Sequence, residues 1–468
     1  MATKGWKDTH DERGVGALIK VMKFGGTSVG SAQALDRVIN IISNESAKKA
    51  VVVSAQSGVT NSLIAWMKDD TQGIDSIISF LETKYFEPVK NKLDEAARQS
   101  YENQIRESLL QLRKLLERYR NNLENSLQDA IASWGERLSV IMVSSLLNAR
   151  GVDSVPMNAE DAGIVALGVH GNGSADLDAT TKNFKKTILP LIDSGKTPVI
   201  TGYYGCGKDG KPITFGRGGS DYSAAVVAYG IAADCLEIWT DVDGFMTADP
   251  RIVPNARTIK EMDYGEAGEL AYFGAKVLHP RTIEPVRRKK IRLLVKNTFN
   301  PDGSGTLIHS LRSPGKTLLR SVAIKSDLSI VKIYSSEIAY QPGFVSDLLN
   351  AIGEDGVTTY AISTSLSTLA VVIPTSEVPQ ALKKINELKE SRMEKLMVKN
   401  NMSLICAVGD NMIDTMGVAA RIFQVVEEAQ ANVELISEGA SDIALNFVVP
   451  SDRAPDVVRM LHDRYIGG

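Results

Sequence analysis

The feature that most constrains the fold is the alternation of short apolar runs with amphipathic segments through the first three hundred residues. Most of these runs are apolar along their whole length, which is typical of strands buried on both faces of a parallel sheet. The six runs are GALIKVMKF, KAVVVSA, VDSVPMNA, TPVITGYY, CLEIWTDV and IRLLVKNT. We therefore predict an α/β fold with a largely parallel sheet, whose ligands bind at the carboxyl ends of the strands.

Composition excludes several classes of protein. The 468 residues are 43% hydrophobic and 23% charged, with a net charge of -3. We expect no nucleic acid as a partner because there is no basic stripe, and no membrane span because no run approaches ~20 apolar residues. Cys206, Cys235 and Cys406 are too far apart for a zinc site or a disulfide framework, which favours a cytoplasmic location and predicts no bound metal site. The polar residues 1–20 predict a loose arm without a signal peptide.

Two later regions depart from the alternation. Residues 76–128 are charged and helical, with leucines recurring at three and four; they predict a helical insertion packed on the sheet, the alternative being a partner-binding coiled coil. Beyond PDGSGTLIH the chain repeats itself: LSIVKIY from Leu328 and MSLICAV from Met402 are 74 residues apart, as are Gly343 and Gly417. The repeat predicts two α+β modules of about seventy residues, regulatory or for assembly, with structural padding as the alternative.

One glycine motif is set aside. Residues 205–210 satisfy GxGxxG, but an extended run follows them where a dinucleotide site needs a helix. Asp209-Gly210 between two extended segments predicts a β-hairpin instead.

Four clusters predict the handling of an anion. In KFGGTSVGS, Lys23 precedes Gly25, Gly26 and a helix start, a combination that favours phosphate. In TFGRGGSDYSAA, glycines surround Arg217, Ser220 is the expected N-cap, and Asp221 falls in the first turn of a helix. The remaining two are EIWTDVDGFMTADPR, with Thr240, Asp241 and Arg251, and AYFGAKVLHPRTIEP, with Lys276 in an expected helix. An Asx-stabilised turn and a solvated helix charge are the alternatives for these two.

Glu136 opens the apolar helical segment of ASWGERLSVIMVSSLL. It is predicted either to pair with Arg137 or to face a cleft, and its place near a helix start would by itself explain a glutamate.

The catalytic motifs of several enzyme classes are missing. There is no HExxH, no GxxxxGK[ST], no HRD or DFG set, and no histidine beside a Ser or Cys motif. Phosphoryl transfer depends on positioning and positive charge, and a carboxylate acceptor needs no general base. The cations among glycine turns therefore favour this reaction.

The motifs KFGGTSVGS, VVVSAQSGVTN, WGERLS, FGRGGSDYSAA, EIWTDVDGFMTADPR, AYFGAKVLHPRTIEP and VKNTF, in this order, resemble the aspartate kinase branch of the amino-acid kinase family. The repeated tail resembles its paired ACT domains. The resemblance implies a largely parallel sheet sandwiched by helices and then two ferredoxin-like α+β domains. It implies a catalytic domain over 21–308 and a regulatory region over 309–468, with ACT domains at about 325–395 and about 396–468 plus a strand near 320–325.

The resemblance also implies transfer of the γ-phosphoryl group of MgATP to the β-carboxylate of L-aspartate, the first step towards lysine, threonine, methionine and isoleucine. The residues implied to hold aspartate are Thr60, Glu136, Arg217, Gly218, Gly219 and Ser220, with Asp221 beside them. Those implied for ATP are Lys23, Phe24, Gly25, Gly26, Thr240, Asp241, Met246, Arg251, Lys276 and Val277; Lys23, Arg217, Asp221 and Lys276 are the expected catalytic residues. Two residues depart from the family's motifs. Met246 stands where a tyrosine is usual, and Gln56 stands where a methionine or serine is often found.

For the regulatory tail, the residues expected to form an effector site are Gln341, Gly343, Phe344, Thr364 and Ser365. Tyr360 and Leu366 stand where lysine-sensitive relatives carry an acid, which a buried lysine ammonium would need. We therefore expect threonine rather than lysine as effector, or no effector. The second module is expected to pair subunits into a homodimer or higher homo-oligomer.

Two other functions compete with this one. The chain could be another small-molecule kinase of the same family, acting on glutamate, acetylglutamate or a nucleoside monophosphate. It could also be a catalytically inactive amino-acid sensor, although both lysines and both arginines are retained. A fused homoserine dehydrogenase is not expected at this chain length.

Overall fold

The computed structural model describes residues 18–69, 71–274, 277–311, 317–336, 338–341, 343–354, 356–387, 393–410, 412, 414–438 and 441–467. The chain divides into two compact units. The first unit contains Met1–Val242 and Glu284–Gly303, and the second contains Asp243–Ile283 and Ser304–Gly468. Most of the expected arm, residues 1–17, lies outside the described residues.

The six predicted strands form a parallel sheet in the first unit. They are β1 (Ile19–Phe24), β2 (Lys48–Val53), β3 (Ser154–Met157), β6 (Thr197–Thr201), β9 (Cys235–Thr240) and β11 (Arg292–Asn297). Their order is β11-β9-β1-β2-β6-β3, and every neighbouring pair is parallel. Two short antiparallel hairpins accompany it, β4 (Ala166–Val169) with β5 (Asn172–Ala175), and β7 (Tyr204–Cys206) with β8 (Pro212–Thr214). The second hairpin contains the rejected GxGxxG motif, as predicted.

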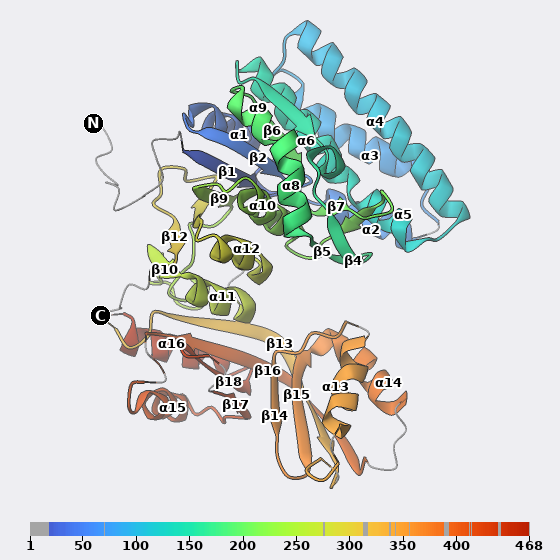
Figure 1. The fold of residues 1–468 in the computed structure, drawn as a ribbon. Helices are drawn as coiled ribbons and strands as arrows, with labels where there is room; N and C mark the ends of the chain where they lie inside the picture. The colour runs from blue at the N-terminus through green and yellow to red at the C-terminus, as the bar shows by residue number, and fades with distance from the viewer. Residues whose placement is uncertain are drawn as a thin grey trace. The chain divides into compact units, whose positions relative to one another are not determined.

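Helices cover both faces of this sheet (Figure 1). Alternate residues of the strands, among them Met22, Phe24, Val51 and Val53, share one core with α1 (Ala32–Asn44) and α6 (Trp134–Ala149). The small-residue helix α10 (Gly219–Gly230) packs against β1, β2 and β9. The other helices are α2 (Val59–Lys68), α7 (Ala159–Ala162), α8 (Leu177–Thr187), α9 (Leu189–Asp193) and α12 (Ile283–Arg288), whose first residue is assigned to the second unit.

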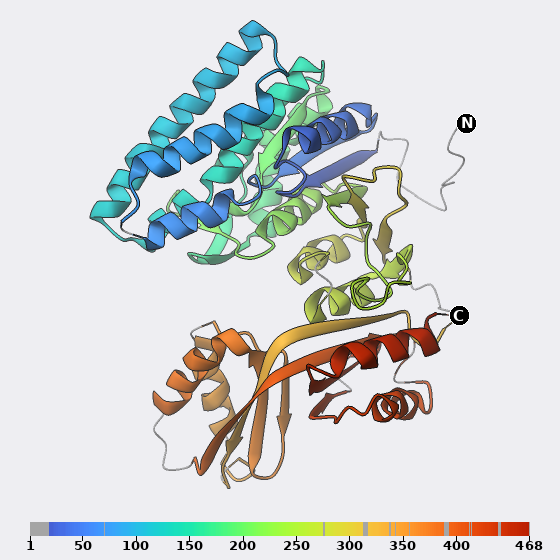
Figure 2. The ribbon, with the colours of Figure 1, turned by 180° about the vertical axis from the view of Figure 1, so that it is seen from behind.

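The insertion is helical and belongs to the same core. It consists of α3 (Ile74–Phe86), η1 (Glu87–Val89), α4 (Glu95–Asn121) and α5 (Asn125–Ala132), and Figure 2 shows α3 and α4 side by side. Leu109, Leu112 and Leu116 of α4 are buried with the residues of the sheet. The amphipathic helices thus pack on this chain's own core, as the first of the two alternatives predicts.

One helical run within the described residues is long and apolar enough to cross a membrane. It covers Asn125–Ala149, and 78% of its most apolar 18-residue window is buried inside the fold. Such burial is typical of a core helix.

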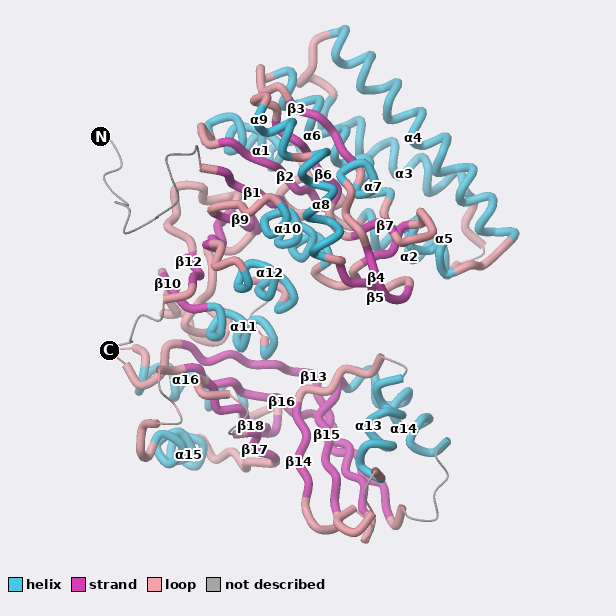
Figure 3. The backbone as a smooth tube through the Cα atoms, viewed as in Figure 1, coloured by secondary structure: helices cyan, strands magenta, loops and turns pink. Residues whose placement is uncertain are grey.

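The second unit contains one antiparallel sheet that both repeats share (Figure 3). Its order is β14 (Ala361–Thr364), β15 (Thr368–Pro374), β13 (Ser321–Tyr334), β16 (Lys395–Val408), β18 (Ala444–Pro450) and β17 (Leu435–Ser437). The helices of the repeats are α13 (Phe344–Glu354), α14 (Val378–Glu387), α15 (Val418–Glu428) and α16 (Ala454–Tyr465), with η3 (Thr375–Glu377) before α14. The unit also contains β10 (Glu261–Asp263), α11 (Tyr264–Phe273), η2 (Pro280–Thr282) and β12 (Thr306–His309), with β10 and β12 parallel.

Backbone conformation confirms the internal repeat. Three pairs of residues 74 positions apart have positive φ angles: Asp327 and Asn401, Gly343 and Gly417, Gly356 and Gln430. A hydrogen bond is repeated as well, because the hydroxyls of Ser329 and Thr375 are 2.9 Å apart and so are those of Ser403 and Ser451. The two modules therefore have the same backbone path.

The long strands β13 and β16 run through both modules. Val322, near the start of β13, belongs to the core formed with α15 and α16. Val331 and Ile333, near its end, belong to the core formed with α13 and α14. Each module thus lends a half-strand to the other, and neither core is complete without both strands.

Candidate functional site

A buried ion pair lies at the carboxyl end of the parallel sheet. The Nζ atom of Lys23 in β1 is 2.6 Å from Oδ1 of Asp221 in the first turn of α10, and the two side chains are 9% and 16% exposed. β1 lies between β2 and β9, so the backbone of Lys23 is held by pairing with Val52 and Ile238. A lysine placed in this way has a fixed position and a charge little screened by water.

The glycine turn after β1 is packed between two neighbouring strand ends. The amide of Gly25 donates to the carbonyl of Trp239 at 3.1 Å, and a Cβ on Gly26 would lie 2.8 Å from the carbonyl oxygen of Ala55. A Cβ on Gly25 would lie 3.5 Å from Nζ of Lys23. Glycine therefore leaves room beside the ammonium group where an anion can approach the backbone.

Phe24 differs from its neighbours, because its side chain is fully buried and stacks on Trp239 with 6.0 Å between ring centroids. Only its backbone can contact a ligand. At the end of β9, the Thr240 hydroxyl donates to Asp241 at 3.2 Å, and its carbonyl accepts from the amide of Thr298.

Glu136 lies at the start of α6 and is 3% exposed. Burial raises its pKa to about 8, against the opposing effects of the Ala55 backbone, the Lys23 charge and a hydrogen bond from Ser220. Its Oε2 atom has no hydrogen-bond partner among the described residues. The alternative of a Glu136–Arg137 pair is wrong, because Arg137 pairs with Glu160 at 2.6 Å.

Two contacts fix the position of Glu136. A Cβ on Gly135 would lie 2.4 Å from Cβ of Ala55, so only glycine lets α6 begin this close to the loop after β2. The buried Tyr85 hydroxyl of α3 donates to the Gly135 carbonyl at 2.7 Å. Thr60, expected beside Glu136, is half-buried in the first turn of α2.

The loop before α10 corrects one sequence prediction. Gly218, with φ of 70°, is the N-cap of α10, so Ser220 lies inside the helix and is not its cap. Glycine reaches this left-handed conformation without strain, which lets the helix begin earlier than the serine suggested. Arg217 is exposed, and no hydrogen bond or ion pair of its side chain is found within the described part of the chain.

Tyr203, which has a φ of 78°, was not predicted as a site residue from the sequence. It packs against the loop before α10, because a Cβ on Gly219 would lie 2.9 Å from Cδ2 of Tyr203. Burial and the charge of Glu136 raise the pKa of its hydroxyl to about 12. Non-glycine residues with positive φ are concentrated at functional sites. In the sequence, the preceding Gly202 is the signal that this segment lies close to the start of α10. A Cβ added to Gly202 would lie 2.7 Å from Cβ of Ser220.

The other residues predicted for ATP belong to the second unit. The sulfur of Met246 accepts a hydrogen bond from Thr258, Arg251 is 79% exposed and pairs with Asp249 at 2.6 Å, and Val277 is half-buried. Lys276 lies outside the described residues. The helix predicted around it, α11, ends earlier, at Phe273.

The expected effector residues lie in two places, at the start of α13 and in the β14–β15 hairpin. Gly343 has φ of 99° and precedes α13, whereas Phe344 is 1% exposed and belongs to the core of the first module. Gln341, Thr364 and Ser365 are exposed. In the same module, Lys325 places its ammonium 5.1 Å from the ring centroid of Tyr360.

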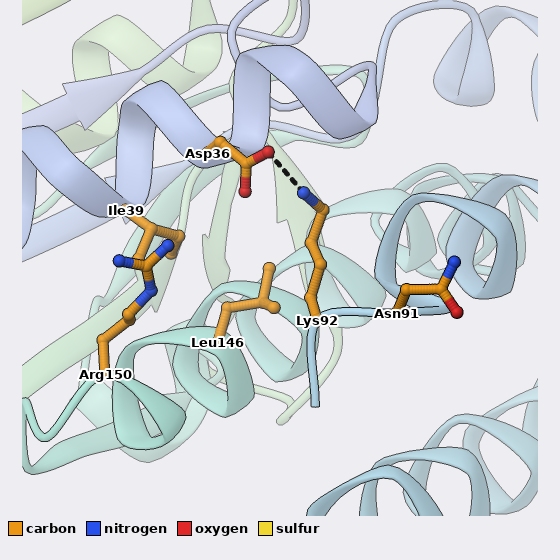
Figure 4. A pocket seen from close by; sticks show the side chains of 6 residues that line it. All are labelled: Asp36, Ile39, Asn91, Lys92, Leu146 and Arg150. Atoms are coloured by element: carbon orange, nitrogen blue, oxygen red, sulfur yellow. Dashed lines mark hydrogen bonds and ion pairs between the residues drawn. The ribbon is translucent and has the colours of Figure 1, made fainter. Parts of the chain in front are cut away.

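A separate cavity of about 280 Å³ lies between α1 and the end of α6, lined by Asp36, Ile39, Asn91, Lys92, Leu146 and Arg150 (Figure 4). Lys92 pairs with Asp36 at 2.5 Å, so two of the charged side chains that line the cavity neutralise each other. The α6 residue Leu146, which lines this cavity, is 10 residues beyond Glu136 (146 − 136 = 10), or about 15 Å along the helix. We place the site at Lys23 and Glu136 instead.

Comparison with known proteins identifies the class first. The sequence profile of the Amino acid kinase family matches residues 19–297, and that of the ACT domain matches residues 405–465. The chain belongs to the amino acid kinase family.

Its relatives define the branch. Aspartokinase 2 of Arabidopsis thaliana is 31% identical over 98% of this chain and 86% of its own length, and lysine-sensitive aspartokinase 3 of Escherichia coli is 30% identical over 95% and 98%. A bifunctional aspartokinase/homoserine dehydrogenase of Haemophilus influenzae is 30% identical, with 56% of its length covered. This chain is a member of the aspartokinase family.

Solved structures agree with this assignment. Aspartokinase III of Escherichia coli in complex with aspartate and ADP superposes with a TM-score of 0.84 at 29% identity, covering 95% of this chain and 99% of that one. The same enzyme in complex with lysine and aspartate gives a TM-score of 0.80 at 27% identity, covering 96% and 99%. The predicted amino-acid-kinase sheet and ACT region are therefore confirmed.

Proposed function

We propose that this aspartokinase transfers the γ-phosphoryl group of ATP to the β-carboxylate of L-aspartate. The observation that carries the proposal is a buried glutamate, Glu136, with one oxygen unpartnered, close to the Lys23–Asp221 ion pair. Such a carboxylate suits a substrate ammonium, and the nearby lysine suits a transferring phosphoryl group. The complex of the Escherichia coli enzyme with aspartate and ADP supports this assignment.

On the aspartate side, we assign the substrate ammonium to Glu136 and a substrate carboxylate to Arg217. The guanidinium of Arg217 is exposed and can form a bidentate pair with a carboxylate. Thr60 and Ser220 would add hydroxyls, and Gly218 and Gly219 would allow close approach of the backbone. Because the acceptor is already a carboxylate, no general base is required.

On the nucleotide side, Lys23 stabilises the transferring phosphoryl group, and Asp221 holds the lysine in place. Backbone groups of Phe24, Gly25 and Gly26 would contact phosphate. We also assign to the nucleotide Thr240, Asp241, Met246, Arg251, Lys276 and Val277. Charge stabilisation by fixed cations is the main protein contribution to phosphoryl transfer.

We propose that Mg²⁺ is required and is held mainly by the phosphate oxygens of ATP. Within the described residues, no group of three or more His, Cys, Asp or Glu side chains could hold a metal ion. This fits a metal that arrives with the nucleotide and neutralises its charge.

For regulation, we propose threonine as the effector and the tandem ACT region, within 309–468, as its site. The cation of Lys325 beside Tyr360 would repel the side-chain ammonium of lysine, a group that threonine lacks, so it disfavours lysine as effector. We propose a homo-oligomer formed through the edge strands β14 and β17, whose equivalent residues Ile362 and Ile436 are 42% and 46% exposed. The three free cysteines support a cytoplasmic location.

The experiment is an aspartyl-hydroxamate assay with MgATP and L-aspartate, with glutamate in parallel. Product from aspartate alone supports the proposal. A folded protein that makes product from neither, yet binds threonine, would instead be an amino-acid sensor.

A further inference from the structure

A buried carboxylate on α5 joins three segments of the first unit. Asp129 is 5% exposed, and its Oδ2 atom accepts hydrogen bonds from the backbone amides of Gly171 and Thr214, both at 2.9 Å. Its Oδ1 atom accepts from the Thr214 hydroxyl at 2.9 Å, and Nδ1 of His170 lies 3.2 Å from Oδ2. These donors come from the β4–β5 turn and from β8. Hydrogen bonds to an ionised, buried acceptor are among the stronger ones in proteins.

Thr214 is the last residue of β8, and the loop that follows it carries Arg217. The loop is held on its other side by the turn that Asp129 also binds, because a Cβ on Gly216 would lie 3.2 Å from the Gly171 carbonyl oxygen. The amide of Phe215 donates to the Tyr203 carbonyl at 2.8 Å. Asp129 therefore fixes both the start of the loop and the surface against which it lies.

The same contacts extend to the proposed aspartate site. Tyr203 joins the loop to that site, because its carbonyl accepts the Phe215 amide and a Cβ on Gly219 would lie 2.9 Å from its ring. Burial and the charges of Glu136 and Asp129 raise the pKa of its hydroxyl. Tyr203 therefore lies against the loop that Asp129 holds, and the charge of Glu136 reaches its hydroxyl.

We infer that Asp129 is a positioning residue for the amino-acid substrate, acting through Thr214 on residues 215–219 and on Tyr203. The inference rests on the proposed function, since it concerns the loop that presents Arg217 to aspartate. Arginine has a flexible side chain, and fixing its backbone reduces the entropy lost when it binds. A carboxylate is needed because two backbone amides and the Thr214 hydroxyl donate to its two oxygens; an amide nitrogen in place of either oxygen would face one of these donors.

The test compares Asp129→Asn and Thr214→Val with a matched control, Ser144→Ala, in full-length protein. Ser144 forms a buried hydroxyl pair with Ser154 at 2.9 Å in the same unit but contacts neither loop. We expect Asp129→Asn to raise the KM for aspartate about tenfold, the factor set by losing a hydrogen bond to a charged group, with the KM for ATP within about twofold. Thr214→Val retains the hydrogen bond from the backbone amide of residue 214 to Asp129, so it should raise the KM for aspartate less. Ser144→Ala should lower stability without altering either KM.

Hydrogen exchange of the ligand-free protein provides a readout independent of activity. In Asp129→Asn, the amides of residues 169–172 and 214–220 should exchange faster than in the unmodified protein. In Ser144→Ala, they should exchange at the same rate as in the unmodified protein. The inference is overturned if exchange there is unchanged, or if both KM values change together in proportion to lost folded protein. If the unmodified protein makes no aspartyl hydroxamate, the proposed function fails, and the exchange comparison still decides whether Asp129 orders the loop.

Discussion

The ammonium nitrogen of Lys23 lies 2.6 Å from Oδ1 of Asp221, so the end of strand β1 and the first turn of α10 are joined by a charge pair at the proposed site. The pair keeps a lysine in place before substrate arrives. It also means that a phosphate group must share this lysine with a carboxylate.

The first prediction concerns this lysine. Lys23→Ala should lower kcat by about 100- to 1,000-fold, as is usual when one stabilising group for a developing charge is removed. Lys48→Ala, which breaks the exposed Lys48–Asp193 pair at 2.8 Å on the next strand, should leave kcat unchanged. The measurement is initial rate in the hydroxamate assay with both substrates saturating. Equal rates for the two variants would remove Lys23 from the reaction.

A second prediction follows from the raised pKa of Glu136. Its pKa is about 8 in the folded protein against 4.5 for a free side chain, so between these values the folded state binds the extra proton. The free energy of unfolding contributed by Glu136 therefore falls as pH rises through this range. Glu136→Gln should become more stable relative to the unmodified protein as pH increases, as measured by urea unfolding without aspartate.

Glu107→Gln, which alters an exposed carboxyl of α4, is the control for that series and should follow the unmodified protein at each pH. The KM for aspartate should fall as pH approaches about 8, because an ionised Glu136 is required to pair with the ammonium group. Unfolding curves of Glu136→Gln that stay parallel to those of the unmodified protein would contradict this explanation.

The third prediction concerns Gly135. An alanine there would place its Cβ 2.4 Å from Cβ of Ala55 and 2.9 Å from Cγ1 of Val59, so the start of α6 must shift. We expect a loss of about 1–3 kcal/mol in the free energy of unfolding, typical of overpacking, and a raised KM for aspartate because Glu136 moves as well. Gly73→Ala, at an N-cap with nothing within 4 Å, should change neither. Urea titration and kinetics decide between these outcomes.

The fourth prediction concerns the effector. Threonine should inhibit at lower concentration than lysine. The ammonium of Lys325, 5.1 Å from the Tyr360 ring, would repel the side-chain ammonium of a lysine effector. Leu366→Asp should increase the response to lysine, and the change should fold normally because Leu366 is 66% exposed. Inhibition curves with each amino acid provide the measurement. Stronger inhibition by lysine than by threonine in the unmodified protein would refute it.

Local sequence was sufficient for the parts of the structure that depend on local composition. The buried strands could be predicted because burial on both faces requires continuous apolar runs, and Lys23 could be singled out because it is a charge at the end of such a run. Asp129 could not, since its partner Thr214 is 85 positions away and nothing near either residue signals the contact. Tyr203 was missed for the same reason, because its contact with Gly219 at the start of α10 joins residues 16 positions apart (219 − 203 = 16). Ser220 was misassigned as a cap because the left-handed conformation of Gly218 is set by the packing of that loop.

The strand exchange between the two regulatory modules has a consequence for synthesis on the ribosome. β13 ends at Tyr334, but its partner β16 begins at Lys395, about 60 residues later. At about 5–20 residues per second, β13 waits about 3–12 s with one edge unpaired. During that interval the nascent chain exposes a long apolar strand edge to its neighbours on the polysome, so the synthesis of residues 335–395 is the period when this protein most needs a chaperone.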